Sequence, residues 1–142
     1  MPERTATAHW EGPVKQGHGR LAVESGALDA GYSFGARFED EAGTNPEELL
    51  GAAHAGCFTM ALALELTEAG HPPSRIDTTA RVAIEKDSNG FHIPHIALSV
   101  EAEAPGLAPS DFDRLTRSAK DNCPVSKALA GTSIDLAAKL LT

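Results

Sequence analysis

Hydrophobic and polar residues alternate weakly over residues 1–40, in three stretches separated by glycine-containing turns. The stretches read TATAHWEG, GHGRLAVESG and GYSFGARFE, and the last places Tyr32, Phe34 and Ala36 on one face of a strand. Aromatic residues and valine flanked by glycine are typical of short strands joined by tight turns. We therefore predict a small antiparallel meander in this part of the chain.

The next segment, TNPEELLGAAHAGCFTMALALELTEAG, has the signals of one long helix. Asn45 suits the N-cap, Pro46 suits the first helical position, and Glu48 stands three residues after the cap. Gly70, followed by HPP, ends the helix. Since residues 49–64 are apolar or small on nearly every side, we predict a buried central helix.

We expect this helix to be too short and too polar to span a bilayer, because four polar or small residues interrupt it: Gly51, His54, Gly56 and Glu65. The start of the chain, MPERTATAHWEG, has no apolar core of the kind a signal peptide carries. We therefore expect a cytoplasmic protein with no membrane partner. In a reducing compartment a cysteine pair is more often catalytic, redox-sensing or metal-binding than structural.

The remaining residues alternate as strands or follow a helical period. RIDTTARVAIEKD predicts a half-buried strand with alternate residues on one face: Ile76, Thr78, Ala80, Val82 and Ile84. DSNG predicts a hairpin turn, and FHIPHIALSVEAEAPG its partner strand, whose alternation slips near Pro94. APSDFDRLTRSAKDN predicts an amphipathic helix with Phe112, Leu115 and Ala119 on one side. CPVSKALAG predicts a short helix and TSIDLAAKLL a closing strand, so residues 1–142 make one α+β domain.

Composition narrows the function classes. The 142 residues carry a formal charge of −8, and the 12 basic residues are scattered rather than clustered. Nucleic-acid binding needs clustered lysine and arginine, so we expect no nucleic-acid partner. A hydrophobic content of 42% with few aromatics predicts a globular protein with a mainly aliphatic core.

The chain has two cysteines, and their settings differ. Cys57 lies inside the apolar helix, where desolvation alone would raise its pKa, so a reactive Cys57 needs a cation within reach. His54, three positions earlier, is a candidate for that cation, but packing is the simpler interpretation of both residues. Cys123, before Pro124, stands at an N-cap position whose free N–H groups favour an anion, although it could also be a buried cap residue.

A metal site is not indicated. His92 and His95 are an odd number of positions apart on a strand and so point to opposite faces. Two distant cysteines and one helical histidine are too few ligands for zinc. We therefore expect no metal and no cofactor. The residues alone favour a two-cysteine redox protein.

Several motifs together resemble the OsmC/Ohr family of thiol peroxidases, over residues 9 to about 134. They are HWEG, ESGALD, YSFGARFE, GTNPEELLGAAHAGCFTMAL, RIDTTARVAIEK and CPVSKAL. CPVSKAL and the arginine of GARFE are similar to the OsmC branch, whereas the Ohr branch carries its arginine in the first hairpin. Here that hairpin reads VKQGHGRL, in which Lys15 and Arg20 are the cations. The resemblance implies an α+β OsmC-like fold, with antiparallel sheets around a long buried central helix in an intertwined homodimer.

The resemblance also implies residue roles. Cys57 would be the peroxidatic thiol, Cys123 the resolving thiol, and Arg37 with Glu47 the ion pair beside the thiolate. Glu47 rather than Glu48 matches the family's glutamate, ten residues before the cysteine. Two structural alternatives remain: Glu48 caps the helix, and Arg37 is an exposed charge at a strand end.

Helix geometry adds a constraint to these roles. Ten helical residues separate Glu47 from Cys57 by about 15 Å along the axis, so the two side chains cannot meet within one straight helix. If both belong to one site, Glu47 comes from a second copy of the helix. A helix that is apolar on all sides also needs more cover than one small meander provides. We therefore expect a homodimer with two composite sites.

The function implied is thiol-dependent reduction of an organic hydroperoxide, with hydrogen peroxide a weaker substrate. Cys57 becomes a sulfenic acid, Cys123 condenses with it to a disulfide, and an external dithiol, such as a lipoyl-type reductant, restores both thiols. We expect Ala53, Phe58, Met60 and the leucines around Cys57 to favour organic substrates. The alternatives are a redox sensor with little turnover and a structural or binding protein in which Cys57 only packs.

Overall fold

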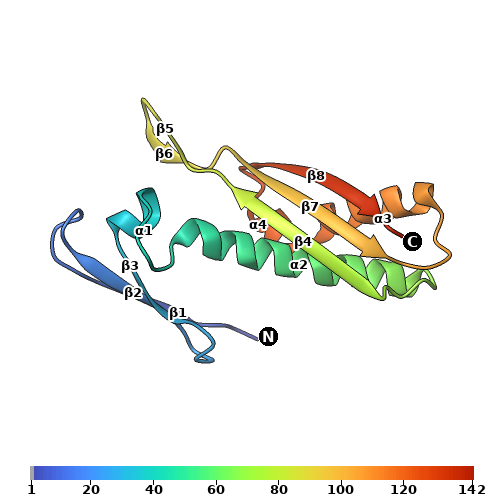
Figure 1. Ribbon diagram of the computed structural model, residues 1–142, viewed down its shortest axis with the longest axis horizontal. Helices are drawn as coiled ribbons and strands as arrows, with labels where there is room; N and C mark the ends of the chain where they lie inside the picture. Colours follow the sequence, from blue (N-terminus) through green and yellow to red (C-terminus); the bar gives the residue numbers. More distant parts are fainter. Residues whose placement is uncertain (1) are drawn as a thin grey trace. The chain divides into compact units, whose positions relative to one another are not determined.

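The computed structural model describes residues 2–142, which divide into two compact units, one up to Leu49 and one from Leu50 to Thr142. Each unit has a three-stranded sheet of its own (Figure 1). The predicted α+β class is confirmed by this mixture of helices and sheets. The expectation of a single domain stays a prediction.

The sheet of the first unit is the predicted antiparallel meander. It consists of β1 (Ala6–Glu11), β2 (His18–Val23) and β3 (Asp29–Tyr32), in that order. Leu21 of β2 is the register partner of Ala8 in β1 and Ala30 in β3. The alternation of the first two stretches therefore predicted both strands and their pairing.

The third stretch was predicted wrongly beyond Tyr32. Phe34–Phe38 form a short helix, α1, and not the continuation of a strand. The Ser33 hydroxyl accepts a hydrogen bond from the N–H of Ala36 at 3.0 Å, which caps the first turn. This cap outweighs the weak strand-like alternation of three residues. Arg37 therefore lies in the last turn of a helix and not at a strand end.

The sheet of the second unit has the order β4–β7–β8. β4 (Arg75–Val82) runs antiparallel to β7 (His95–Glu103), and β8 (Ser133–Leu140) runs parallel to it. The expectation of antiparallel sheets is therefore wrong for the β7–β8 pair. A parallel pair needs a long crossover. That crossover consists of α3 (Pro109–Asn122) and α4 (Pro124–Ala128), which Figure 1 shows beside the sheet.

The core of the second unit lies between one face of this sheet and the helices. The strands contribute Ile96, Leu98, Val100 and Ala102 of β7, flanked by the alternate residues of β4 and β8. Helix α3 contributes its predicted apolar side, Phe112, Leu115 and Ala119, and helix α2 (Pro46–Glu68) contributes Phe58, Leu62 and Leu66. This packing fixes the positions of α2 and of the α3–α4 junction, where the two cysteines lie.

The strand prediction around the DSNG turn needs a correction. β4 ends at Val82, so Ile84 is not part of it, and the turn closes a separate hairpin of β5 (Glu85–Asp87) and β6 (Gly90–His92). Gly90 has a φ of 109°, which favours glycine at this turn. The expected slip near Pro94 is the break between β6 and β7. The partner of β4 is β7, with Val82 opposite Ile96.

The ends of α2 agree with the sequence signals. The N–H of Glu48 donates to Asn45 Oδ1 at 2.8 Å, Pro46 opens the helix, and Gly70 follows its end with a φ of 84°. The prediction that α2 is buried on all sides is not met in the single chain. Met60 is 78% exposed and Leu64 is 58% exposed, so one side of α2 lacks cover within the second unit.

The expectation that α2 is too short and too polar to span a bilayer was wrong on both counts. Its 23 residues are long and apolar enough to cross a membrane by length and composition alone. No other helix among residues 2–142 meets both criteria. The core helix of a soluble protein passes the same test, so this is weak evidence for a span.

Candidate active site

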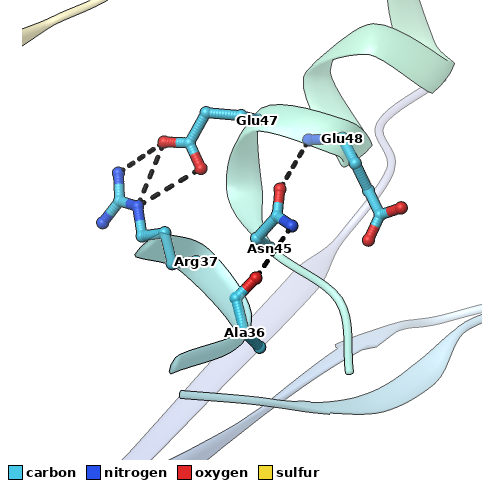
Figure 2. A network of polar contacts seen from close by, with 5 residues as sticks. All are labelled: Ala36, Arg37, Asn45, Glu47 and Glu48. Atoms are coloured by element: carbon cyan, nitrogen blue, oxygen red, sulfur yellow. Dashed lines mark hydrogen bonds and ion pairs between the residues drawn. The ribbon is translucent and has the colours of Figure 1, made fainter. Parts of the chain in front are cut away.

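The first unit brings two of the predicted site residues into an ion pair. Arg37 Nη2 donates to Glu47 Oε1 at 2.7 Å, and Arg37 Nε donates to Oε1 at 3.0 Å and to Oε2 at 3.3 Å (Figure 2). Two guanidinium nitrogens thus face one carboxylate, the fork geometry that gives arginine–carboxylate pairs their directionality. The pair holds the guanidinium plane in a defined orientation.

Asn45 fixes the two helix ends that carry this pair. Its Oδ1 accepts from the N–H of Glu48, and its Nδ2 donates to the carbonyl of Ala36 at 3.2 Å (Figure 2). One side chain therefore caps α2 and bonds to α1. Glu48 has the capping position expected of it, and its carboxylate accepts from the Thr44 hydroxyl at 3.0 Å. Glu48 is accordingly not a partner of Arg37.

The two members of the pair differ in exposure. The side chain of Glu47 is 9% exposed, whereas that of Arg37 is 37% exposed and its Cζ lies 5.2 Å from the centroid of the Phe38 ring. Glu47 also stands in the first turn of α2, where the helix dipole favours a negative charge. A held, half-exposed guanidinium with its Nη1 group outside the pair can bind an anion.

The second unit brings the two cysteines together. Cys57, half-buried in α2, and Cys123, fully buried at the junction of α3 and α4, have their sulfur atoms 2.8 Å apart. Cys123 is both the C-cap of α3 and the N-cap of α4, because Pro124 favours the first position of α4. The sulfur of Cys123 faces Cys57.

The environment of Cys57 opposes its ionisation, as the sequence predicted. Burial raises the pKa of the Cys57 thiol, and its hydrogen bond and charge interaction with Cys123 raise it further. The N–H of Val125 acts in the other direction, but it does not compensate. Within this unit Cys57 therefore remains a thiol.

Cys123 shows the opposite balance. Burial by itself would raise its pKa, but the hydrogen bond with Cys57 and nearby donors of α4 lower it overall. These donors are the N–H and the hydroxyl of Ser126 and the N–H of Val125. Of the two sulfurs, Cys123 therefore has the lower pKa.

His54 is not the cation that the sequence suggested for Cys57. It is fully buried, its Nε2 lies 2.8 Å from Ser126 Oγ, and burial lowers the pKa of its imidazole. A neutral His54 cannot stabilise a thiolate at Cys57 by charge. Sequence reasoning missed Ser126, and the only available signal was its place three residues after Cys123 in CPVSKAL.

The predicted site residues thus form two pairs, one in each unit. The structure contains the Arg37–Glu47 pair and the Cys57–Cys123 pair, and it defines each unit by itself. Among residues 2–142 no group of three or more histidine, cysteine, aspartate or glutamate side chains could hold a metal ion. The chemistry available in the second unit is that of thiols, and in the first unit that of a guanidinium held by a carboxylate.

Comparison with known proteins identifies the family. The sequence model described as OsmC-like protein matches residues 38–138, a span that contains Glu47 and both cysteines. The chain belongs to the OsmC-like family. The expected family resemblance is confirmed by this match, which covers more than half of the chain.

Individual members of the OsmC-like family are similar to this chain in sequence and in fold. Peroxiredoxin OsmC of Escherichia coli is 54% identical over 123 residues, which are 86% of each chain. Organic hydroperoxide resistance protein OhrA of Bacillus subtilis is 34% identical over 93 residues, 64% of this chain and 63% of its own. The crystal structure of an organic hydroperoxide resistance protein from Elizabethkingia anophelis superposes with a TM-score of 0.78 at 27% identity, covering 99% and 97% of the two chains. The fold is therefore the one that OsmC and Ohr proteins share.

The sulfur contact predicts easy formation of an internal disulfide. Closing the gap from 2.8 Å to the bond length of about 2.05 Å requires a small movement of one side chain. Mild oxidation of the reduced protein should therefore join Cys57 to Cys123, as peptide mapping without reductant would show. Cys123→Ser should give no internal bond. Disulfides between chains as the main product of the unaltered protein would contradict the contact.

Proposed function

We propose that this protein is a cysteine-based peroxidase that reduces organic hydroperoxides through a disulfide between Cys57 and Cys123. The observation that carries the proposal is the sulfur contact of 2.8 Å between a half-exposed and a buried cysteine. A nucleophile needs access to its substrate, whereas a resolving thiol needs access only to the nucleophile. The relatives named peroxiredoxin and organic hydroperoxide resistance protein support the same reaction class.

The first step is attack of the Cys57 thiolate on the terminal oxygen of the hydroperoxide. The sulfur–oxygen bond forms as the oxygen–oxygen bond breaks, and the alkoxide leaves and takes a proton to become an alcohol. Cys57 is then a sulfenic acid, oxidised by two electrons, and the peroxide is reduced by two.

This step needs a cation, because the sulfur pair alone leaves the proton on Cys57. A positive charge within about 4–6 Å lowers a thiol pKa by about 1–3 units. We assign that charge to Arg37, whose guanidinium is held by Glu47 and is half exposed. The same guanidinium would stabilise the negative charge that develops on the departing alkoxide.

The second step forms the disulfide, and a third step, reduction by a dithiol, restores the thiols. The Cys123 thiolate attacks the sulfur of the sulfenic acid, the sulfur–sulfur bond forms, and hydroxide leaves and takes a proton to become water. Two further electrons come from an external dithiol, for which a lipoyl-type compound has the required chemistry.

The reaction needs no metal or cofactor. A cytoplasmic location without membrane or nucleic-acid partners is part of the proposal.

A homodimer would explain how the two pairs cooperate. Glu47 and Cys57 lie on one helix about 15 Å apart along its axis, too far for their side chains to meet. The exposed side of α2, with Met60 and Leu64, offers apolar surface for a second copy. We therefore assign Arg37 and Glu47 of each chain to the cysteine pair of the other.

Removal of the Cys57 sulfur and removal of the Cys123 sulfur should affect different steps. Cys57→Ser should abolish consumption of cumene hydroperoxide in an assay with a dithiol, because no nucleophile remains. Cys123→Ser should be oxidised once and then stall or over-oxidise, because nothing resolves the sulfenic acid. Full turnover by Cys57→Ser would contradict the proposal. Oxidation of the unaltered protein without turnover would favour a redox sensor.

Mixed dimers test the assignment of Arg37 and Glu47. Cys57→Ser and Glu47→Ala subunits are each expected to be inactive alone, since one lacks the nucleophile and the other the partner of Arg37. A heterodimer isolated with two affinity tags should recover about one intact site, because its remaining thiol faces an intact ion pair. No activity in verified heterodimers, or a stable active monomer, would show that each chain completes its own site.

Substrate size is the third expectation. Phe58 was expected to line the substrate site, but it is fully buried in the core, so Ala53, Met60 and Leu64 are the apolar residues on the exposed side of α2 near Cys57. Burial of about 100 Å² of substrate against them contributes about 2–3 kcal/mol, or roughly tenfold to a hundredfold in selectivity. Cumene hydroperoxide should therefore have a higher kcat/KM than hydrogen peroxide, mainly through KM. The reverse order at equal pH and reductant would indicate a polar site.

A further inference from the structure

A buried hydrogen bond lies one helical turn from the sulfur pair. Ser126, on α4, follows Cys123 by three residues, and its Oγ lies 2.8 Å from Nε2 of His54, which precedes Cys57 by three residues on α2. The Ser126 hydroxyl also contributes to the lowered pKa of the Cys123 thiol. The mechanism proposed above uses neither Ser126 nor His54.

At both positions an apolar side chain would be buried at a lower cost in folding free energy. His54 is fully buried, and the other fully buried side chains of α2 are Phe58, Leu62 and Leu66. Within residues 2–142 the Nδ1 atom of His54 has no hydrogen-bond partner. A buried ring with one unpaired nitrogen opposes folding, so a packing role does not explain histidine at this position.

The geometry points to Ser126 and His54 as positioning residues that stabilise the thiolate of Cys123 and thereby accelerate disulfide formation. This inference rests on the proposed function, since it assumes that Cys123 resolves the sulfenic acid. With the proton of a neutral His54 on Nε2, that N–H donates to Ser126 Oγ. The hydroxyl proton of Ser126 is then free to point at the Cys123 sulfur, and Nδ1 carries no proton.

The chemistry of the resolving step makes this donor useful. Cys123 must lose its proton before its sulfur attacks Cys57, and the hydroxide that leaves the sulfenic acid takes up one proton. The overall change is therefore sulfenic acid plus thiol giving disulfide plus water. A donor at the Cys123 sulfur raises the fraction that is ready to attack. It matters most after Cys57 has been oxidised, when Cys57 no longer offers a thiol proton to Cys123.

The expected effect is moderate. Loss of a hydrogen bond to an anion lowers the thiolate fraction by about tenfold to a hundredfold. A thiolate of higher pKa is also a better nucleophile. On a logarithmic scale this gain in nucleophilicity cancels a fraction of about 0.4–0.5 of the loss in thiolate. Ser126→Ala should therefore slow disulfide formation roughly threefold to tenfold. The first oxidation of Cys57 should not slow, because a less ionised Cys123 places less negative charge beside it.

The experiment follows both steps in single-turnover stopped flow with cumene hydroperoxide. Ser126→Ala and His54→Leu should slow the second phase and increase over-oxidation at high peroxide. Ser126→Thr and His54→Gln, which keep a hydroxyl and a donor N–H, should restore much of the rate. Ser118→Ala is the matched control. The hydroxyl of Ser118, on α3, also donates to α2, to Glu65 Oε1 at 2.6 Å, but Ser118 is not part of the His54–Ser126 hydrogen bond. It should leave the second phase unchanged.

A second readout separates this inference from the peroxidase proposal. In the Cys57→Ser background the ultraviolet absorbance of the Cys123 thiolate can be titrated without any peroxide. The thiolate should appear at higher pH in Ser126→Ala than with Ser126 present, and thermal unfolding would confirm that each variant is folded. Equal titrations and equal second phases in Ser126→Ala and Ser118→Ala would overturn the inference. A shifted titration in a protein that consumes no peroxide would retain the thiolate donor and reject the peroxidase.

Discussion

The contact between the sulfurs of Cys57 and Cys123 is the constraint on which the chemistry of this chain depends. It joins the middle of α2 to the junction of α3 and α4, positions 66 residues apart in the sequence. The core holds both ends in place, since Phe58 and Leu62 of α2 and Ala119 of α3 are all buried within a turn or so of a cysteine. Cys123 reaches the contact because Pro124 separates two helices at that residue.

The contact also creates a difficulty that the rest of the site must resolve. The donors around Cys123 lower its pKa, while burial and the neighbouring Cys123 raise the pKa of Cys57, the more accessible sulfur. The unaided pair therefore favours a resolving thiolate over a peroxidatic one. A guanidinium held by a buried carboxylate, as in the Arg37–Glu47 pair, is the kind of group that can reverse this preference. This requirement supports the proposal that each site combines residues from two chains.

Much of the fold could be predicted from the sequence because its local signals were unambiguous. Alternation gave β4 and β8, the helical period of Phe112, Leu115 and Ala119 gave α3, and Asn45 with Pro46 gave the start of α2. Helix α1 was missed because one capping hydroxyl, on Ser33, outweighed a strand-like alternation. The exposed side of α2 was missed because an apolar pattern predicts that side chains are buried. It does not say whether residues of the same chain or of another chain cover them.

The site was less accessible to sequence reasoning. The Arg37–Glu47 ion pair and the cysteine contact came from the family resemblance, and the geometry agrees with both pairings, while the roles of all four residues stay predictions. The bond between His54 and Ser126 joins residues 72 positions apart, and no spacing rule relates a helix interior to a distant hydroxyl. Only tertiary packing brings them together.

The central claim is that Cys57, and not the more acidic Cys123, is the sulfur that the peroxide oxidises. It is tested most directly by trapping the sulfenic acid with dimedone during a single turnover of the unaltered protein, followed by peptide mass spectrometry. The account predicts the adduct on Cys57, in low yield while Cys123 competes for it and in higher yield in Cys123→Ser. An adduct found on Cys123 instead would contradict the account, because it would make the buried thiolate the nucleophile.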